Sequence, residues 1–335
     1  MAGGLWARKV QLGRETTAGT AVDATTIWRG EGTAIQDNRE VTMVNEQIGI
    51  RVNTLRSYIA QLGAECSFAS TPATFEQLPH ILEAAIKTLT PAADGTGSGY
   101  VYDYEVDNTA NNTIKTYTIE TGDDQQARHM FYSFVESFTL TGERGGAVSM
   151  EANWIGRDVA NNAFTTSVAV PVVEEILAGS GLFYIDDTDD DFGDTRVEAT
   201  LLRWQLSVTT GWKGKYTVGD GRRDFLFHYF DKDAFSVELT MTYEHCSDAV
   251  TEITAMENQT PRLFRIGITG SALSTSSAYS AKTLVIDVAG KYTAFGALNA
   301  DEGNSIVEAT VKGGYDSTEA HSLGILIVNE LSALP

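Results

Sequence analysis

Apolar and polar residues alternate along much of the chain, which is the pattern of a β-strand with one buried face. In residues 235–243, FSVELTMTY, every second side chain is apolar, and residues 202–208 follow the same rule. The same kind of pattern predicts further strands, at residues 58–68, 114–120, 132–140, 148–155, 263–269, 283–288 and 323–328. Frequent Thr, Val, Tyr and Phe fit strands better than long helices. The chain is therefore predicted to be mainly β.

Only two segments show the period of a helix. In residues 74–89, TFEQLPHILEAAIKTL, a capping box of Thr74 and Gln77 precedes apolar residues at helical spacing. Pro79 is expected to split or bend this helix. In residues 247–258, Ser247 is expected to cap a short helix that ends before a proline. Each helix follows one strand and precedes several more.

This order of elements occurs twice, which predicts a tandem duplication. VSMEANWIG, which begins at Val148, and SIVEATVKG, which begins at Ser305, share Glu-Ala at the same place, and their residue numbers differ by 157. At the two helices the difference is near 174. The excess falls on a segment rich in Gly, Asn and Asp, residues 91–112, which predicts a surface loop or hairpin inserted into the first half.

A length of 335 residues also favours two domains over one. We predict two β-domains, residues 1–170 and 196–335, of β-sandwich or β-barrel type. Each carries one short α-helix packed on its sheets. Residues 171–195 are predicted to be an acidic linker between them.

The predicted linker holds six aspartates within YIDDTDDDFGDT, residues 184–195. Asp187, Asp189 and Asp191 fall at positions 1, 3 and 5 of a calcium-binding loop, and Glu198 falls at position 12. Phe192, however, stands where that loop requires Gly, and a strand is expected to follow instead of a helix. We therefore predict a hydrated, self-repelling linker without a metal. A calcium site of another geometry is the alternative.

The net charge of −21 argues against a protein that grips nucleic acid, because phosphate binding requires Lys and Arg. An acidic surface can serve solubility alone, or it can let a nucleic acid pass without sticking. The five histidines are scattered and form no close ligand pair. His228 with Asp231 and Asp233 could be drawn as a ligand trio, but a charged loop is the favoured interpretation.

No nucleotide-binding or nucleophile motif is present, so neither a catalytic centre nor a cofactor is predicted. A β-rich hydrolase with two carboxylates across a cleft remains an alternative, because acids are so frequent. Cys66 and Cys246 are expected to be ordinary buried thiols. The chain shows no apolar run of signal-peptide or membrane-span length, so we expect it to be made and folded in a cytoplasm, without a membrane partner.

Two long segments of mixed charge, residues 38–56 and 209–233, interrupt the strand pattern at corresponding places in the two halves. The second combines Lys213, Lys215, Arg222 and Arg223 with aromatic residues and nearby aspartates. A basic, aromatic segment on an acidic protein predicts contact with another copy of the chain. The alternative is that both segments are ordinary long hairpin loops.

The phrase GRETTAGTA, residues 13–21, followed by the helical passage at 74–89, resembles the major tail tube proteins of long-tailed bacteriophages. Those proteins commonly begin with G-x-E-x-T-x-G-T and carry one helix packed on a β-sandwich. The ending, residues 283–335, is also similar to the C-terminal part of the larger members.

The resemblance implies a structural virion protein that assembles in the host cytoplasm into the phage tail. Its subunits would form stacked rings whose inner sheets join into one β-barrel. The acidic lumen would pass DNA and the tape measure protein without sequence-specific binding. Tail terminator and tail tip proteins would be partners at the tube ends. Most members have one domain and six chains per ring, so a two-domain variant implies a pseudo-sixfold homo-oligomeric ring of three chains.

The resemblance also implies which residues contact the next ring. In the two long segments these are Arg39, Glu46, Arg51, Lys213, Lys215, Arg222, Arg223 and Asp231, and in the N-terminal arm, residues 1–14, they are Trp6, Arg8 and Lys9. The competing interpretations are another phage structural protein, or a β-sandwich adhesin or carbohydrate-binding module. Such a module is expected to expose a cluster of aromatic side chains and to stay monomeric.

Overall fold

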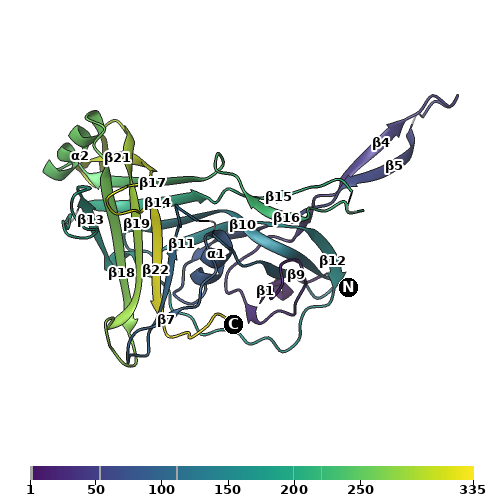
Figure 1. Cartoon of the computed structure of the whole chain (residues 1–335), viewed down its shortest axis with the longest axis horizontal. Helices are drawn as coiled ribbons and strands as arrows, with labels where there is room; N and C mark the ends of the chain where they lie inside the picture. The colour runs from purple at the N-terminus through teal and green to yellow at the C-terminus, as the bar shows by residue number, and fades with distance from the viewer. Residues whose placement is uncertain (1–2, 53, 111, 199, 220) are drawn as a thin grey trace.

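The computed structural model describes residues 3–52, 54–110, 112–198, 200–219 and 221–335. Within them the protein is mainly antiparallel β-sheet, and its α-helices are α1, Leu78–Ala85, and α2, Ser247–Glu257 (Figure 1). The predicted mainly β fold is confirmed. Two short 3-10 helices, Leu5–Ala7 and Ala178–Ser180, precede the first strands of the two halves of the chain.

The largest sheet, which we call the central sheet, contains eight strands in the order β3-β6-β11-β10-β14-β17-β21-β19, and every neighbouring pair is antiparallel. Its strands are β3 Gln36–Asp37, β6 Ala64–Pro72, β11 Ser149–Gly156, β10 Ala127–Glu143, β14 Leu201–Thr209, β17 Ser236–Glu244, β21 Asn304–Gly313 and β19 Ala281–Phe295. The short strand β20, Asn299–Asp301, extends the β19 edge by pairing with β21.

Two strands of the central sheet, β10 and β19, are long enough to belong to two sheets. The N-terminal part of β10 enters the sheet β2-β1-β9-β10-β12, and the N-terminal part of β19 enters the sheet β13-β18-β19-β22-β8-β7. The additional strands are β2 Thr26–Ile27, β1 Lys9–Arg14, β9 Tyr117–Gly122, β12 Asp158–Asn162, β13 Gly181–Asp186, β18 Arg262–Ala272, β22 Leu323–Asn329, β8 Tyr100–Glu105 and β7 Ala92–Ala93.

A β-bulge lies in each long strand near the place where it changes sheets, between Val135 and Ser137 in β10 and between Tyr292 and Ala294 in β19. A bulge bends a strand because one extra residue opposes its partner. The buried side chains of the central sheet pack between it and the two outer sheets, and α1 is buried along its whole length.

Two hairpins extend beyond the sheets. The first consists of β4, Glu40–Asn45, and β5, Thr54–Gln61; the second consists of β15, Trp212–Lys215, and β16, Phe227–Phe230. We call them the first arm and the second arm. The first arm projects away from the body of the molecule, whereas the second arm lies along it (Figure 1).

Both helices form where the sequence predicts them, but their starts differ in detail. Pro79 neither splits nor bends α1, because it lies in the first turn, where its missing N–H has no helical partner to lose. The Thr74 hydroxyl accepts a hydrogen bond from the backbone N–H of Gln77, at 3.2 Å. The cap predicted for Ser247 is wrong, since Ser247 is the first residue of α2 and the preceding Cys246 makes no side-chain cap bond.

Two further predicted segments can be compared with the structure. Residues 91–112 hold β7 and β8, which pair with each other as a hairpin, one of the two predicted forms. β8 also pairs with β22 and buries Tyr102 and Tyr104, so the segment is not a surface loop. The single strand predicted at residues 58–68 is two strands, β5 and β6, because Leu62 and Gly63 between them belong to neither strand.

The predicted linker at residues 171–195 contains the strand β13, which pairs along its whole length with β18. Asp186 ends this strand, and its buried carboxylate accepts hydrogen bonds from the backbone N–H groups of Gly193 and Thr195. Asp187 forms an ion pair with Arg262. Two of the six aspartates, Asp186 and Asp187, are therefore anchored to the sheet, which corrects the expected connector at this end of the run. Asp189, Asp190, Asp191 and Asp194 are exposed.

The two halves of the chain share sheets. β10 pairs with β14 in the central sheet, from Ser137 opposite Thr209 to Glu143 opposite Arg203. β8 pairs with β22 in an outer sheet. Strands from residues 1–170 and from residues 196–335 are thus hydrogen-bonded to one another at two places.

Candidate assembly surfaces

The first arm exposes apolar side chains on a ribbon of only two strands. Val41, Met43, Leu55 and Tyr58 are all more than half exposed, and further exposed apolar residues, Ile48, Ile50 and Val52, lie in the tip. A two-stranded ribbon is marginally stable alone, and exposed apolar groups on it indicate a contact surface. This is the largest set of exposed apolar residues on any one element of the described chain.

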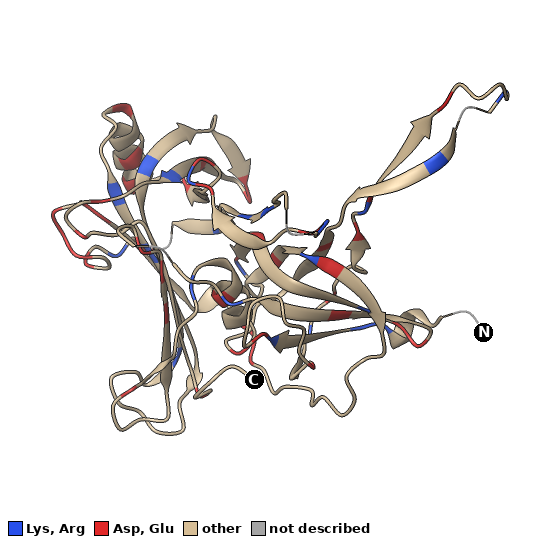
Figure 2. Cartoon of the chain, turned by 45° about the vertical axis from the view of Figure 1, so that its right-hand side comes forward, with Lys and Arg blue, Asp and Glu red and all other residues tan. Residues whose placement is uncertain are grey.

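The charged residues predicted as contacts in this arm either pair locally or, as for Arg51, have no partner among the described residues. Arg39 binds Asp37 at its base (Nε to Oδ2, 2.7 Å), and Glu46 binds Arg56 across the ribbon (2.8 Å). Arg51 is exposed in the tip of the arm, where the ribbon in Figure 2 carries the blue of Lys and Arg. Exposed pairs of this kind contribute little to stability. The apolar residues, which the charge-based prediction missed, dominate this surface.

The second arm is docked on the first half of the same chain. The Trp212 indole N–H donates to the Ala85 carbonyl at the end of α1, at 2.9 Å, and Trp212 is 7% exposed. Phe225 is buried with its ring edge-on to Tyr132 and Phe134, with centroids 5.2 and 5.9 Å apart. The hydrophobic effect therefore holds this arm against the bend of β10.

The predicted contact residues of the second arm lie mostly within this docked ribbon. Lys213 binds Asp231 at 2.7 Å, and Arg222 binds Asp224 at 2.9 Å. The Lys215 ammonium lies 5.4 Å from the centre of the Tyr229 ring. The carbonyl of Arg223 accepts a hydrogen bond from the N–H of Leu62, at the base of the first arm.

His228 lies among aromatic rings instead of carboxylates. Its ring is 5.3 Å from that of Trp212 and 5.8 Å from those of Tyr132 and Phe134. Burial lowers its pKa. Among the described residues, His228, Asp231 and Asp233 do not come close enough together to share a metal ion. The side chains that do are those of Asp187, Asp189 and Asp190, and all three are exposed. Asp191, predicted as the third ligand, is outside that group.

The N-terminal arm places its three predicted contact residues differently. Trp6 is 90% exposed in the first 3-10 helix. Arg8 lines a broad groove of about 870 Å³ beside Trp28 and Arg128. Lys9 begins β1, and its ammonium lies 4.3 Å from the centre of the Phe164 ring. Trp6 is thus available to a partner, whereas Lys9 is engaged within the chain.

The GRETTAGTA phrase ties the N-terminal segment to the bend in β10. The Glu15 carboxylate is 1% exposed and accepts four hydrogen bonds: from the N–H of Gly19 (2.7 Å), the hydroxyls of Thr116 (2.7 Å) and Thr118 (3.1 Å), and the N–H of Tyr132 (2.8 Å). Tyr132 has a φ of 54°, which a non-glycine residue adopts only when its surroundings hold it there. Glu15 therefore helps to maintain the bend.

A glycine is required at position 19 of the same phrase. Its φ is +80°, and a Cβ there would lie 2.3 Å from the guanidinium of Arg157. That guanidinium also covers the face of the Tyr132 ring, 3.9 Å from its centre. Packing and hydrogen bonding thus account for Glu15 and Gly19 in this phrase as structural residues.

The solvent-facing side of the central sheet is polar. Along each strand, buried apolar residues alternate with exposed or half-exposed polar ones. The polar set includes Gln36, Glu65, Ser67, Ser137, Thr139, Glu143, Glu151, Asn153, Arg203, Gln205, Ser207, Glu238, Thr240, Thr242, Lys291, Glu308, Thr310 and Lys312. Among the described residues of this face, carboxylates outnumber cations and none of the exposed side chains is aromatic. The period-two alternation that predicts the strands also contained this signal.

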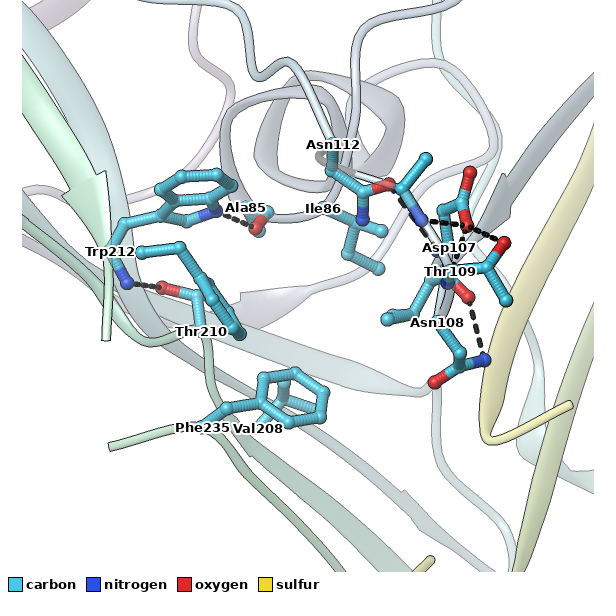
Figure 3. Close-up of a pocket in the computed structure, with 13 residues that line it drawn as sticks. Ala85, Ile86, Asp107, Asn108, Thr109, Asn112, Val208, Thr210, Trp212 and Phe235 are labelled. Atoms are coloured by element: carbon cyan, nitrogen blue, oxygen red, sulfur yellow. Dashed lines mark hydrogen bonds between the residues drawn. The ribbon is translucent and has the colours of Figure 1, made fainter. Parts of the chain in front are cut away.

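A cavity of about 380 Å³ lies between the end of α1, the loop after β8 and the base of the second arm (Figure 3). Trp212, Ile86 and Phe235 line its apolar side, and the Asp107 carboxylate, which belongs to the loop, accepts hydrogen bonds from the N–H groups of Thr109 and Ala110. Its described lining contains no histidine, cysteine, lysine or second carboxylate. This cavity therefore offers no acid–base pair.

The buried ionisable groups near α1 form a closed network. Arg14 binds Glu83 (Nη2 to Oε1, 2.6 Å), the Tyr117 hydroxyl donates to Glu83 at 2.9 Å, and His80 Nδ1 lies 3.1 Å from the Tyr117 oxygen. Burial, with a further contribution from the charge of Arg14, lowers the pKa of His80 to about 3. His80 is therefore neutral at physiological pH and serves packing.

Acid is expected to destabilise the protein through His80. Because the pKa of His80 is depressed in the folded state, its contribution is complete above about pH 6.5 and is lost as the pH falls toward 3, by up to about 1.4 kcal/mol per pH unit. Urea unfolding between pH 7 and pH 4 measures this slope. His80→Gln should flatten it relative to wild type, and the exposed-site variant His245→Gln serves as the control. An unchanged slope in His80→Gln contradicts the prediction.

Neither helix of the described chain is long and apolar enough to cross a membrane. No protein-family model matches the sequence, and no curated protein matches it at a significant level.

Proposed function

We propose that this protein is a structural subunit of a hollow tube, the major tail tube protein of a long-tailed bacteriophage, and that it forms rings by joining central sheets edge to edge. The observation that carries the proposal is the central sheet itself. It has a polar face, and its outermost strands, β3 on one side and the C-terminal part of β19 on the other, have no described partner on their outer edges. Such edges invite pairing with another chain.

The proposal includes a tandem duplication, which the strand order supports. The central sheet divides into β3-β6-β11-β10 and β14-β17-β21-β19, with the same pairings in each set. The outer strands divide likewise into β1-β9-β10-β12 and β13-β18-β19-β22. On this basis the second unit begins at β13, inside the segment first predicted to be a linker.

The bulges supply a second argument for duplication. Val135 pairs with Trp154 before the β10 bulge, and Tyr292 pairs with Val311 before the β19 bulge. In both comparisons the residue numbers differ by 157, the same difference that aligns Val148 with Ser305 in the sequence. Two bulges at equivalent positions favour common descent of the two halves over a chance likeness of two residues.

A duplicated chain provides its own template for the contact between chains. Within the chain, the β10 edge of the first unit pairs with β14 of the second. The equivalent contact between chains joins the β19 edge to β3 of the next copy. Three chains with eight strands each then close a ring of twenty-four strands, and at a spacing of about 4.8 Å the ring is roughly 37 Å across at the backbone before any tilt is included.

The polar face of the central sheet is proposed to line the lumen. Its excess of carboxylates repels DNA phosphates, and the absence of aromatic side chains from its described residues removes stacking platforms for bases. Short polar side chains such as Ser67, Asn153 and Ser137 hydrogen-bond to one another across the strands, which keeps the surface smooth. A DNA molecule or a tape measure protein could therefore pass with little binding.

Electron microscopy of concentrated, purified protein tests the proposal. Hollow tubes with a regular axial repeat, or isolated rings, are the expected result. Native mass measurement of one ring should give three chains. A dispersed monomer under all concentrations and salt conditions would contradict the proposed function, and a ring of six chains would contradict the pseudo-sixfold arrangement.

The register of the contact between chains can be predicted. Thr139 of β10 lies opposite Ser207 of β14. If the two halves are equivalent, Gly296 corresponds to Thr139, because each follows the corresponding phenylalanine, Phe295 or Phe138. Gln36 likewise corresponds to Ser207, because each pairs with the corresponding glutamate, Glu65 or Glu238. Gly296 should therefore lie opposite Gln36 of the next chain.

A disulfide between engineered cysteines measures this register. Gly296→Cys with Gln36→Cys, in a Cys246→Ser background, is expected to give covalent trimers after mild oxidation of assembled protein. Gly303→Cys with Gln36→Cys is the control, because Gly303 lies at the tip of the β20–β21 turn. Cross-linking that is equal in the two pairs would refute the register.

A further inference from the structure

We propose that the first arm of one copy docks in an empty hollow on the second half of a neighbouring copy, beside α2, and inserts Val41 and Met43 there. The hollow has a volume of about 310 Å³ and is lined by residues that include Pro261, Ala289, Lys291 and Gly314. The inference rests on the proposed assembly of copies into rings, and it names the partner surface that the arm requires.

The docked second arm is the model for this contact. It passes from the second half onto the first and covers the bend of β10 with Trp212 and Phe225. Its binding site contains Tyr132 and Phe134 in β10, and Arg157 after β11, whose side chain donates to the carbonyl of Leu226. The second arm therefore shows that the bend of β10 in the first half is a binding site for an arm, and the equivalent bend of β19 is the place to look for one in the second half.

The hollow occupies the equivalent place on the second half. The proposed duplication relates positions whose residue numbers differ by 157. The counterparts of Tyr132, Phe134 and Arg157 are then Ala289, Lys291 and Gly314, and all three line the hollow. Because Ala289 and Gly314 are much smaller than Tyr132 and Arg157, space is left open. In the first half the corresponding site is filled by the second arm, whereas here no described segment of the chain covers it.

The first arm presents apolar residues at the positions that the second arm uses. The strand pairing makes Asp37 the counterpart of Val208, since Asp37 pairs with Ala64 and Val208 pairs with Val237. Four residues further along the chain, Val41 is then the counterpart of Trp212. Val41 pairs with Ile59 on the returning strand, as Trp212 pairs with Phe230. Trp212 is buried by its contact, but Val41 is 56% exposed and Met43 is 64% exposed.

The direction of the two arms agrees with this assignment. In Figure 1 the second arm runs from the second half over the first half, and the first arm leaves the first half on the far side, pointing in a similar direction. The next copy in a ring built on the β19 and β3 edges would present its second half on that side. The arm therefore points toward the half that carries the hollow.

Charge also fits a second copy as the occupant. Lys291 and Lys312 at the hollow are exposed cations on a chain whose net charge is −21. Arg262, the third cation of the lining, is already held by Glu252 and Asp187. Glu40 is exposed directly beside Val41, so a docked arm brings a carboxylate toward the two lysines.

A cross-linking experiment tests the contact. Met43→Cys with Lys291→Cys, in the Cys246→Ser background, is expected to form covalent links between copies in assembled protein. The control is Met43→Cys with Val172→Cys, since Val172 is 90% exposed but outside the hollow. If rings or tubes are visible and the Lys291 pair links no better than the control, the docking proposal is overturned and the proposed function stands. If the wild-type protein never assembles, both are overturned.

Filling the hollow is an independent test. Gly314→Trp adds a side chain where no atom lies within 4 Å of its Cβ, so the monomer should fold normally while the arm is excluded. We expect at least a tenfold rise in the protein concentration needed for assembly. Gly179→Trp, at another glycine with open space, is the matched control. Assembly of Gly314→Trp at the wild-type concentration would overturn the proposal.

Discussion

Val41→Asp combined with Met43→Asp is expected to abolish ring and tube formation while leaving the chain folded. Both side chains are more than half exposed on β4 and have no part in the core, so the folded monomer loses little. In the proposed contact both are buried, and each contributes about 2 kcal/mol through the hydrophobic effect. Burying two unpaired carboxylates adds a desolvation penalty.

The loss of about 4 kcal/mol per contact corresponds to a weakening of roughly a thousandfold, because each 1.4 kcal/mol is a factor of ten. Sedimentation and electron microscopy of the double variant should show monomer at concentrations where the wild type forms tubes. Its thermal unfolding midpoint should stay within a few degrees of that of the wild type. Val172→Asp, which changes an exposed apolar residue outside the arm, should assemble normally. A double variant that assembles like the wild type contradicts the role given to the arm.

Glu15→Ala is expected to lower the free energy of unfolding by about 3 to 5 kcal/mol. The substitution removes a buried carboxylate that accepts four hydrogen bonds, and it leaves the N–H groups of Gly19 and Tyr132 without their acceptor. A buried donor left unpaired costs about 1 to 3 kcal/mol, and bonds to a charged group are at the upper end. The strained φ of Tyr132 also loses part of its support.

Urea unfolding followed by tryptophan fluorescence measures this effect. Glu31→Ala is the matched control, because Glu31 is exposed, and its change should stay within about 0.5 kcal/mol. Glu15→Gln keeps the volume and one acceptor oxygen, so it should fall between the two. If Glu15→Ala is as stable as Glu31→Ala, the GRETTAGTA phrase does not hold the β10 bend as described.

The local patterns predicted the elements well. The alternation in residues 235–243 and 202–208 became β17 and β14, and the two helical periods became α1 and α2. These predictions succeed because a side chain's position on a strand or helix depends on spacing of a few residues. The strand β13 was missed, since its apolar alternation is short and is followed at once by aspartates.

The candidate surfaces were harder to predict. The sequence placed two long segments at corresponding positions, residues 38–56 and 209–233, and both form arms. Their charges suggested similar roles, yet Trp212 and Phe225 bury the second arm on the first half while Val41 and Met43 leave the first arm exposed. That distinction depends on residues such as Ala85 and Tyr132, which are far away in sequence.

The sequence by itself determined the mainly β strand content and the two helices, and it suggested the spacing of 157 residues on which the proposed duplication rests, because these follow from periodicity and order along the chain. The tertiary structure decided that β10 pairs with β14, that β8 pairs with β22, and that the aspartate run begins within a paired strand. It also decided which arm is covered. Strand edges and buried surfaces are completed by segments more than sixty residues apart, and no local pattern specifies which distant partner will supply them.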